Sequence, residues 1–129
     1  MIKNGQQHLA SLQDGRELFL NGSIISDATK HPAFRNSIAS LCTLYDFQSD
    51  PRNSTIMTYK PINSDGAANR MWQLPGSYDE LVSRRQALES WAERHAGFLG
   101  RSPDHVASCI AGMYMGLDVF KAYDPARAK

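Results

Sequence analysis

The densest group of polar side chains that could carry chemistry lies between residues 101 and 105. It reads Arg101-Ser-Pro-Asp-His105 and follows Gly100 directly. A capping serine with a proline after it is typical of a helix N-terminus. Arg101 would then lie just outside the helix and His105 one turn inside it, so both side chains can face the positive end of the helix dipole. Such a site suits an anion, either a phenolate or a carboxylate.

The same cluster also permits a purely structural role. Arg101 could pair with Asp104 or with a backbone carbonyl, and His105 could be a partly exposed residue of the first turn. Pattern alone favours this structural interpretation. The other histidines, at positions 8, 31 and 95, have no metal-ligand spacing, and the sequence contains no Gly-rich phosphate loop and no H-E-x-x-H motif.

The composition is that of an ordinary globular protein. The chain has 129 residues, 42% of them hydrophobic, and 14 Lys and Arg side chains stand against 13 Asp and Glu, a formal net charge of +1. This length predicts one domain with a core of its own. The charge is split evenly along the chain, which excludes the basic surface that nucleic acid or an anionic membrane would need.

Nothing in the sequence predicts a signal peptide or a membrane span. The longest apolar run, residues 110–117, contains two glycines and is far short of the roughly 20 residues of a spanning helix. Cys42 and Cys109 lie in apolar helical patterns and in no C-x-x-C pair, so we expect both to be buried and reduced. The simplest interpretation is a cytoplasmic protein.

The first elements are predicted from a cap and a turn. Asn4 is a good N-cap for a short helix over residues 6–13, with Gly15 at its end. Asn21-Gly22 stands between two apolar runs, and this pair favours a type I′ turn because that turn needs positive φ at both central residues. We therefore expect a small β-hairpin near residues 17–25.

A longer helix is predicted next, followed by a segment without sustained periodicity. Pro32 suits a first helical turn. Apolar residues then recur at helical spacing, at Phe34, Ile38, Leu41, Cys42 and Tyr45. We expect this face in the core and the helix to end before Asp50-Pro51. Residues 50–76, rich in proline and polar side chains, should be either a functional loop or a segment that lies on a partner.

Two further helices complete the predicted domain. The first of these helices begins with a capping box at residues 77–80. The inner stripe of this helix is Leu81, Arg84, Leu88, Trp91, His95 and Phe98. We expect His95 to be a hydrogen-bonded packing residue. The last helix begins at Ser102, with a stripe of Val106, Cys109, Ile110, Met113, Leu117 and Phe120. Gly112 and Gly116, each costing about 1 kcal/mol relative to Ala, favour close approach of another helix over that of a planar ligand.

Three stretches carry a family resemblance when they are taken together. They are Ser11-Leu-Gln-Asp-Gly-Arg-Glu-Leu-Phe-Leu-Asn-Gly22, His31-Pro-Ala-Phe-Arg-Asn-Ser37 with Leu44-Tyr-Asp46, and Gly100-Arg-Ser-Pro-Asp-His105. In this order they resemble the N-terminal region of the 4-hydroxyphenylacetate 3-monooxygenase family, the oxygenase component of two-component flavin monooxygenases. The resemblance covers nearly the whole chain.

The resemblance implies a mainly α structure, the N-terminal helical domain of an acyl-CoA-dehydrogenase-like fold. It implies an enzyme that takes reduced FAD (FADH2) from a separate reductase and hydroxylates a phenol through a flavin C4a-hydroperoxide. It also implies that Arg101 contacts the phenol oxygen and that His105 hydrogen-bonds the substrate or helps to deprotonate it. Full-length members are usually tetramers.

Residues 1–129 are therefore expected to be one N-terminal helical domain, a fragment of a longer oxygenase. The β-domain and C-terminal bundle that supply most flavin contacts in the family are absent, so we expect this chain alone to be inactive. The position of His105 is Tyr in the hydroxyphenylacetate enzymes. His keeps a hydrogen-bonding group, but it leaves open which phenol is the substrate.

Two alternatives remain open from the sequence. One is a non-catalytic helical interaction fragment of the same fold, which would self-associate through an apolar patch. The other, weaker alternative is an enzyme similar to 4-hydroxybutyryl-CoA dehydratase, whose corresponding helix holds an iron–sulfur cluster with two cysteines four residues apart. Here Met113 stands four residues after Cys109, and a single thiolate cannot replace the pair.

Overall fold

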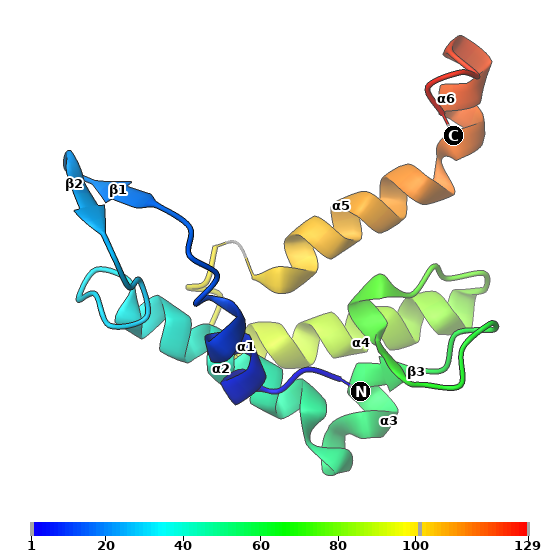
Figure 1. Cartoon of the computed structure of the whole chain (residues 1–129). Helices are drawn as coiled ribbons and strands as arrows, with labels where there is room; N and C mark the ends of the chain where they lie inside the picture. The colour runs from blue at the N-terminus through cyan, green and yellow to red at the C-terminus, as the bar shows by residue number, and fades with distance from the viewer. Residues whose placement is uncertain (1, 101, 129) are drawn as a thin grey trace.

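The computed structural model describes residues 2–100 and 102–128, and most of its ordered elements are helices (Figure 1). The α-helices are α1 (Gly5–Ser11), α2 (Arg35–Ser49), α3 (Ser54–Met57), α4 (Tyr78–Arg94), α5 (Pro103–Met115) and α6 (Leu117–Tyr123). Two short 3₁₀ turns are η1 (Pro51–Asn53) and η2 (Arg70–Trp72). The strands form two antiparallel pairs, β1 (Leu18–Leu20) with β2 (Ser23–Ile25), and β3 (Thr58–Tyr59) with β4 (Ala68–Asn69).

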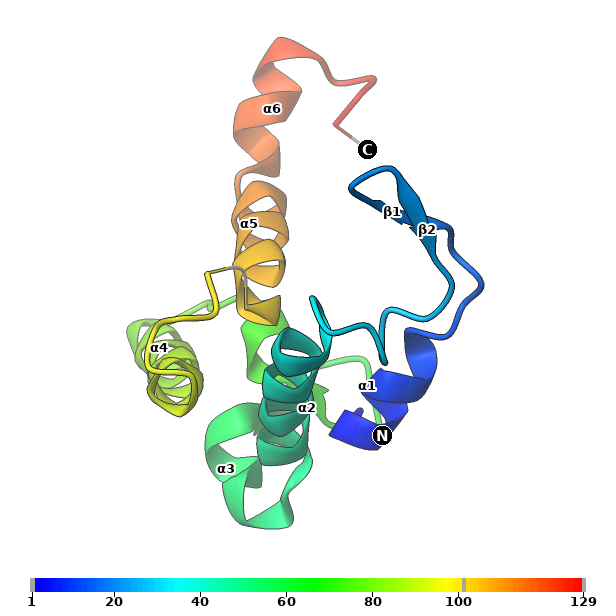
Figure 2. The same cartoon turned by 90° about the vertical axis from the view of Figure 1, so that its left-hand side faces the viewer.

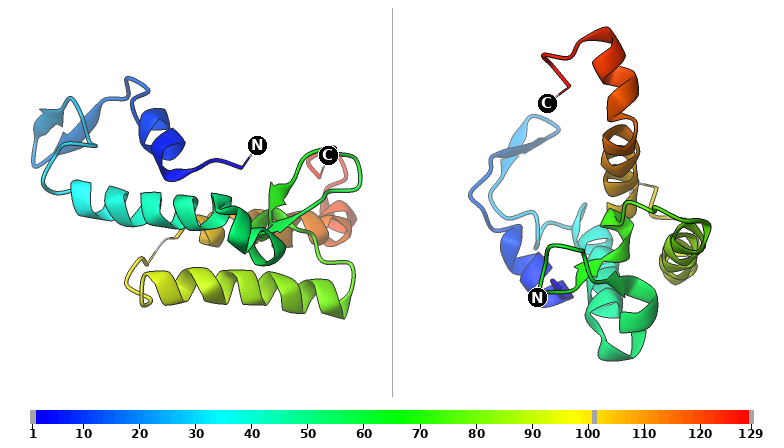
Figure 3. Two further views of the ribbon diagram at one scale, coloured as in Figure 1. Left: turned by 90° about the horizontal axis from the view of Figure 1, so that it is seen from below. Right: turned by 90° about the vertical axis from the view of Figure 1, so that its right-hand side faces the viewer.

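The core lies where α2 and α4 run side by side in opposite directions (Figure 3). Its buried members come from α2, α3, η2, α4 and α5, and they are Leu44, Met57, Met71, Ala87, Trp91 and Ala107. The long helices alone would leave this apolar layer open. The chain between them closes it by contributing two methionines, which are flexible enough to fill an irregular gap.

The first predicted helix is present as α1, which begins one residue earlier and ends two residues earlier than predicted, and it docks on α2. The Asn4 side chain accepts a hydrogen bond from the Gln7 amide, and the Gln7 side chain accepts one from the Asn4 amide. The Gly5 amide donates to Asp46 Oδ1 of α2 at 2.8 Å. A Cβ at Gly5 would lie 2.6 Å from the Cys42 carbonyl oxygen, so the close approach of the two helices depends on glycine.

The predicted β-hairpin is confirmed. Asn21 has φ 51° and Gly22 has φ 80°, as a type I′ turn requires. The hairpin projects away from the α2–α4 layer (Figure 2). Phe19 and Ile24 pair across the strands and are both exposed, while Ile25 is buried. One apolar face of the ribbon is therefore uncovered in this part of the molecule.

The prediction for the second helix is wrong at its start and on its buried face. Pro32 lies in the turn before α2, in which the His31 carbonyl accepts hydrogen bonds from the residue 34 and 35 amides, and α2 begins only at Arg35. The predicted face is only partly buried. The fully buried positions are Leu44 and Gln48, since α2 is covered from two sides, by α1 and by the α3–η2 segment.

Residues 50–76 are not the structureless loop that was predicted. They fold into η1, α3, the β3–β4 pair and η2, and they place Met57 and Met71 in the core. Arg70 holds the segment together by donating to the carbonyls of Ile56 at 2.8 Å and of Thr55 at 3.0 Å. The segment lacks helical periodicity because each of its elements is shorter than the helical repeats that periodicity detects.

The capping serine of α4 is confirmed, but part of the predicted inner stripe is exposed. Ser77 Oγ accepts a hydrogen bond from the Glu80 amide. Trp91 is buried, whereas Leu81 is 52% and Phe98 is 93% exposed. His95 follows the helix and its Nδ1 accepts from the Leu99 amide at 3.4 Å, which agrees with a packing role. No helix of the described residues is long and apolar enough to span a membrane.

Candidate functional site

The candidate site lies at the beginning of α5, where the helix start is as predicted. Pro103 is the first helical residue and Ser102 the N-cap, in an extended conformation. The Ser102 side chain makes no capping hydrogen bond, but its carbonyl accepts one from the His105 amide at 3.0 Å. Arg101, the first candidate for phenol binding, lies outside the described residues.

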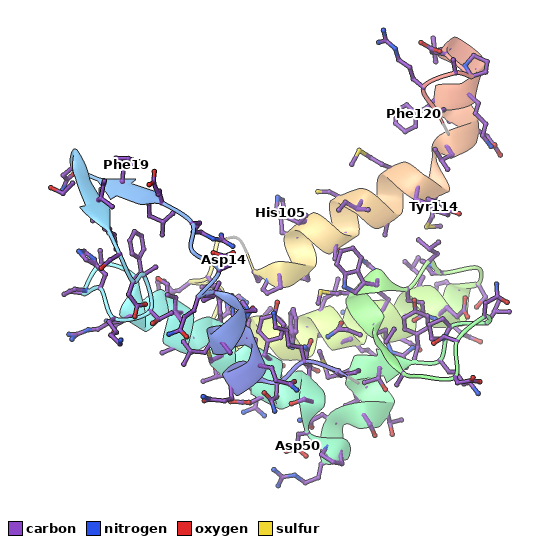
Figure 4. All side chains as sticks on the ribbon, viewed as in Figure 1. Asp14, Phe19, Asp50, His105, Tyr114 and Phe120 are labelled. Carbon is purple, nitrogen blue, oxygen red and sulfur yellow. The ribbon has the colours of Figure 1, made fainter. Side chains whose placement is uncertain are left out.

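His105 is exposed, and its ring points away from α2 and α4 (Figure 4). It occupies the first turn of α5, at the positive end of the helix dipole. The structure therefore leaves the imidazole open to a ligand that approaches from the side opposite the core. An exposed first-turn histidine is equally what the structural interpretation predicts, so the site role of His105 stays a prediction.

The buried face of α5 is not the predicted one. Ala107 and Ala111 face the core, while Val106, Ile110 and Met113 are 58%, 46% and 55% exposed. Cys109 is exposed too, which corrects the expectation that both thiols are buried. Cys42 is half-buried, and burial raises the pKa of its thiol. Small residues lie inwards because η2 approaches α5 closely, and the large apolar residues therefore turn outwards.

The outward side of α5 and α6 carries an apolar groove. It encloses about 530 Å³, and its apolar walls are Ile110, Met113, Tyr114, Leu117, Phe120 and Tyr123. The stretch 106–117 contains no charged side chain. A helix that is apolar on its exposed side is normally covered by protein, so this surface is incomplete as it stands.

The two glycines predicted to lie near another helix have different surroundings. A Cβ at Gly112 would meet nothing within 4 Å among the described residues. Gly116 is the point at which α5 ends and α6 begins, with φ −89° and ψ 10°. Helix packing within this chain thus does not account for Gly112, which faces the same open side as His105 and Cys109.

Periodicity did not reveal the polar link between α4 and α5. The Arg84 guanidinium donates through Nη2 to the Met71 carbonyl at 2.9 Å and to Ser108 Oγ at 2.7 Å. Sequence analysis placed Arg84 on the inner stripe of α4, but no local signal could name its partners, since they are 13 and 24 residues away.

The remaining titratable groups with altered pKa lie away from the start of α5. Hydrogen bonding to Arg16 lowers the pKa of Asp14 to about 2, and Arg52 does the same for Asp50. Both ion pairs are exposed and join residues two positions apart, as is common in surface turns. Among residues 2–100 and 102–128, no group of three or more His, Cys, Asp and Glu side chains could hold a metal ion.

The described residues do not by themselves form a flavin site. A flavin needs donors for its diphosphate and a flat surface for its ring. The outward side of α5 offers room beside Gly112, but the described loops provide no run of backbone amides that converges on a phosphate.

Comparison with known proteins shows relatives that are monooxygenases or oxygenase components of monooxygenases. The (3S)-3-amino-3-(3-chloro-4-hydroxyphenyl)propanoyl-peptidyl-carrier protein SgcC2 monooxygenase of Streptomyces globisporus is 38% identical over 95% of this chain and 24% of its own length. The 4-hydroxyphenylacetate 3-monooxygenase oxygenase component of Klebsiella oxytoca is 36% identical over 84% of this chain and 21% of its own length. This chain spans about a quarter of the length of these relatives.

Solved structures agree on the fold. The oxygenase component of 4-hydroxyphenylacetate 3-monooxygenase, complexed with FAD and 4-hydroxyphenylacetate, superposes with a TM-score of 0.83 at 28% identity, over 92% of this chain and 25% of that one. A 4-hydroxybutyryl-CoA dehydratase from N. maritimus, at 16% identity and a TM-score of 0.77 over 95% of this chain and 24% of that one, shares the fold alone. The mainly α, acyl-CoA-dehydrogenase-like fold is thus confirmed. The family model for the 4-hydroxyphenylacetate 3-hydroxylase N-terminal region matches residues 4–129, and the chain belongs to this family.

Proposed function

We propose that residues 1–129 form the N-terminal domain of a longer oxygenase that hydroxylates a phenol with reduced FAD supplied by a separate reductase. The observation that carries this proposal is the family match over residues 4–129, together with relatives that are oxygenase components. The chain alone is inactive in this proposal, because flavin binding depends on other parts of the protein. The cytoplasmic location and the tetramer expected from the sequence also stay predictions.

The substrate class follows from what the relatives have in common. Their names describe 4-hydroxyphenylacetate, 4-nitrophenol and a 3-chloro-4-hydroxyphenyl group, all of them phenols substituted opposite the hydroxyl. The named positions of attack in the first two lie beside the hydroxyl. We infer a para-substituted phenol as the substrate, with the new oxygen placed next to the existing one.

In this reaction the residues of the chain act on the phenol oxygen. A phenolate ring is a better nucleophile than a phenol ring, so a base and a cation near the oxygen lower the barrier. His105 accepts the phenol proton or a hydrogen bond, Arg101 holds the resulting oxyanion, and the N-terminus of α5 adds its positive dipole. The ring of His105 is exposed on the side away from the core and is therefore accessible to a phenol.

The role of Arg101 is tested in the longer oxygenase with its reductase present. Arg101→Ala should lower kcat/KM for the phenol by about 100-fold or more, because an ionic hydrogen bond to the oxyanion is lost. Arg52→Ala is the matched control, since Arg52 lies at the surface and pairs with Asp50. An Arg101→Ala enzyme within about threefold of wild type would contradict the assignment.

His105 is tested by two substitutions that differ by one hydroxyl group. His105→Tyr keeps a hydrogen-bonding group and should retain most activity. His105→Phe should lose about 100-fold in kcat/KM. Equal rates for wild type and the Phe variant at every pH would show that His105 only lines the surface.

A second candidate function, a non-catalytic interaction module, is favoured by the exposed apolar groove on α5 and α6. It predicts that the chain self-associates and does not respond to reduced FAD or phenols. Size-exclusion chromatography and a hydroxylation assay of the longer protein, with and without reduced FAD and a phenol, separate the two proposals, because the isolated chain is not expected to bind the flavin in either. Dehydratase chemistry is not favoured, since Met113 stands where a second cysteine would be needed, and an iron assay tests it.

A further inference from the structure

We propose that Arg84 is a positioning residue, which sets where the first turns of α5 lie and so where His105 meets the phenol. This inference rests on the proposed function as far as the phenol is concerned. Its structural part, the attachment of α5 to the body of the domain through Arg84, stands on the geometry of the described residues.

The Arg84 side chain joins three elements. It comes from α4 and uses one nitrogen, Nη2, to donate to the Met71 carbonyl of η2 and to Ser108 Oγ of α5. Within residues 2–100 and 102–128, this is the only side-chain hydrogen bond that links α5 to another element. In addition, Ala107 of α5 packs in the apolar core.

That packing alone leaves the position of α5 weakly determined. The helix packs mainly against η2, and its buried side chains are Ala107 and Ala111. Methyl groups permit close approach, but they interlock little with their neighbours, so they resist sliding and rotation poorly. Towards its C-terminal end α5 projects from the body (Figure 1), and Met113, Tyr114 and Met115 are exposed there.

The Arg84 guanidinium forms no ion pair with the described residues. No carboxylate of the described residues lies within 4.0 Å of its guanidinium, and its Nε is shielded from solvent without a hydrogen-bond partner. The role of the Arg84 guanidinium is therefore to make the two charge-assisted hydrogen bonds to η2 and α5.

The link acts close to the candidate site. Ser108 follows His105 by three residues, about one helical turn or roughly 4.5 Å along the axis. A helix moves as a rigid rod over this distance. Any displacement of Ser108 is therefore passed to His105 and to the residues just before the helix, where about 1 Å of misplacement can cost about 100-fold in rate.

Hydrogen exchange on the 129-residue chain tests the link without any reaction. In Arg84→Met, which keeps the apolar stem, and in Ser108→Ala, the amides of residues 105–111 should exchange about tenfold faster, while those of Leu44 and Trp91 keep their rates. Arg85→Met and Ser90→Ala are matched controls, because these neighbours bond only within α4. Unchanged exchange in α5, or an equal rise at Leu44 and Trp91, would overturn the proposal.

Kinetics of the longer oxygenase then test the consequence. Arg84→Met and Ser108→Ala should each lower kcat about tenfold and raise KM less, and the double variant should be no worse than the worse single one, because both break one link. Arg84→Lys should restore part of kcat. Additive losses or a pure KM effect would contradict positioning. An inactive wild-type oxygenase would instead contradict the proposed function, and the exchange result would still decide the link.

Discussion

His8 shows how much the surroundings of one side chain change its chemistry. Its ring stacks on Tyr45 with 4.2 Å between ring centroids, and both ring nitrogens are shielded from solvent without a hydrogen-bond partner. Burial, and after it the charge of Lys3, lowers the pKa of His8 below 6.5. The folded chain therefore prefers the neutral imidazole, whereas the unfolded chain takes up a proton at the ordinary pKa.

This preference predicts a pH dependence of stability. Above pH 6.5 His8 is neutral in both states, and as pH falls from there through the lowered pKa the free energy of unfolding should decrease. His8→Phe keeps the stacked ring without a titrating group and should flatten the curve between about pH 7.5 and about pH 5. The measurement is urea unfolding at each pH, with His105→Phe as the control at an exposed histidine. Parallel curves for wild type and His8→Phe would refute the prediction.

At the scale of the helix, two glycines should respond in opposite ways to alanine. Gly5→Ala puts a methyl group 2.6 Å from the Cys42 carbonyl oxygen, so α1 must move away from α2, at a cost of about 1–3 kcal/mol. Gly112→Ala meets nothing within 4 Å and should raise the free energy of unfolding by up to about 1 kcal/mol. Denaturant unfolding of both variants is the test. A stabilised Gly5→Ala would show that the α1–α2 contact is looser than described.

The β-hairpin should depend on its turn. Gly22 has φ 80°, and an L-residue other than glycine costs about 1–2 kcal/mol in this region. Because a lone two-stranded ribbon is only marginally stable, Gly22→Ala should disorder the hairpin while the helical core stays folded. NMR shifts of residues 18–25 measure the first effect and unfolding by circular dichroism the second. Gly66→Ala is the control, a loop glycine where added bulk is tolerated.

At the scale of the whole molecule, the apolar groove on α5 and α6 is the surface that we expect to control self-association of the chain. The isolated chain should self-associate through it, since Met113 and Tyr114 are 55% and 60% exposed and no charge interrupts residues 106–117. Met113→Lys should shift the chain to monomer in sedimentation velocity experiments. Ile62→Lys adds the same charge at an exposed residue elsewhere and should change nothing. A wild-type chain that is monomeric at high concentration would contradict this prediction.

Much of the local structure could be predicted because short-range physics controls it. The Asn4 cap, the Asn21-Gly22 turn and the start of α5 at Pro103 all depend on backbone preferences within a few residues. The family resemblance rests on the same kind of local motif. The segment 50–76 could not be predicted, because its short elements gain stability only from contacts with helices far away in the sequence.

Sequence alone therefore determined the family, the mainly helical class and the candidate cluster at residues 101–105. Only the tertiary structure decided which face of each helix is buried. Apolar spacing marks an apolar stripe, but on α5 the stripe turns outwards and the alanines turn inwards, because η2 approaches too closely for larger side chains. The contact of Arg84 with Ser108 was decided in the same way, since a hydrogen bond across 24 residues depends on how two helices pack and not on local spacing.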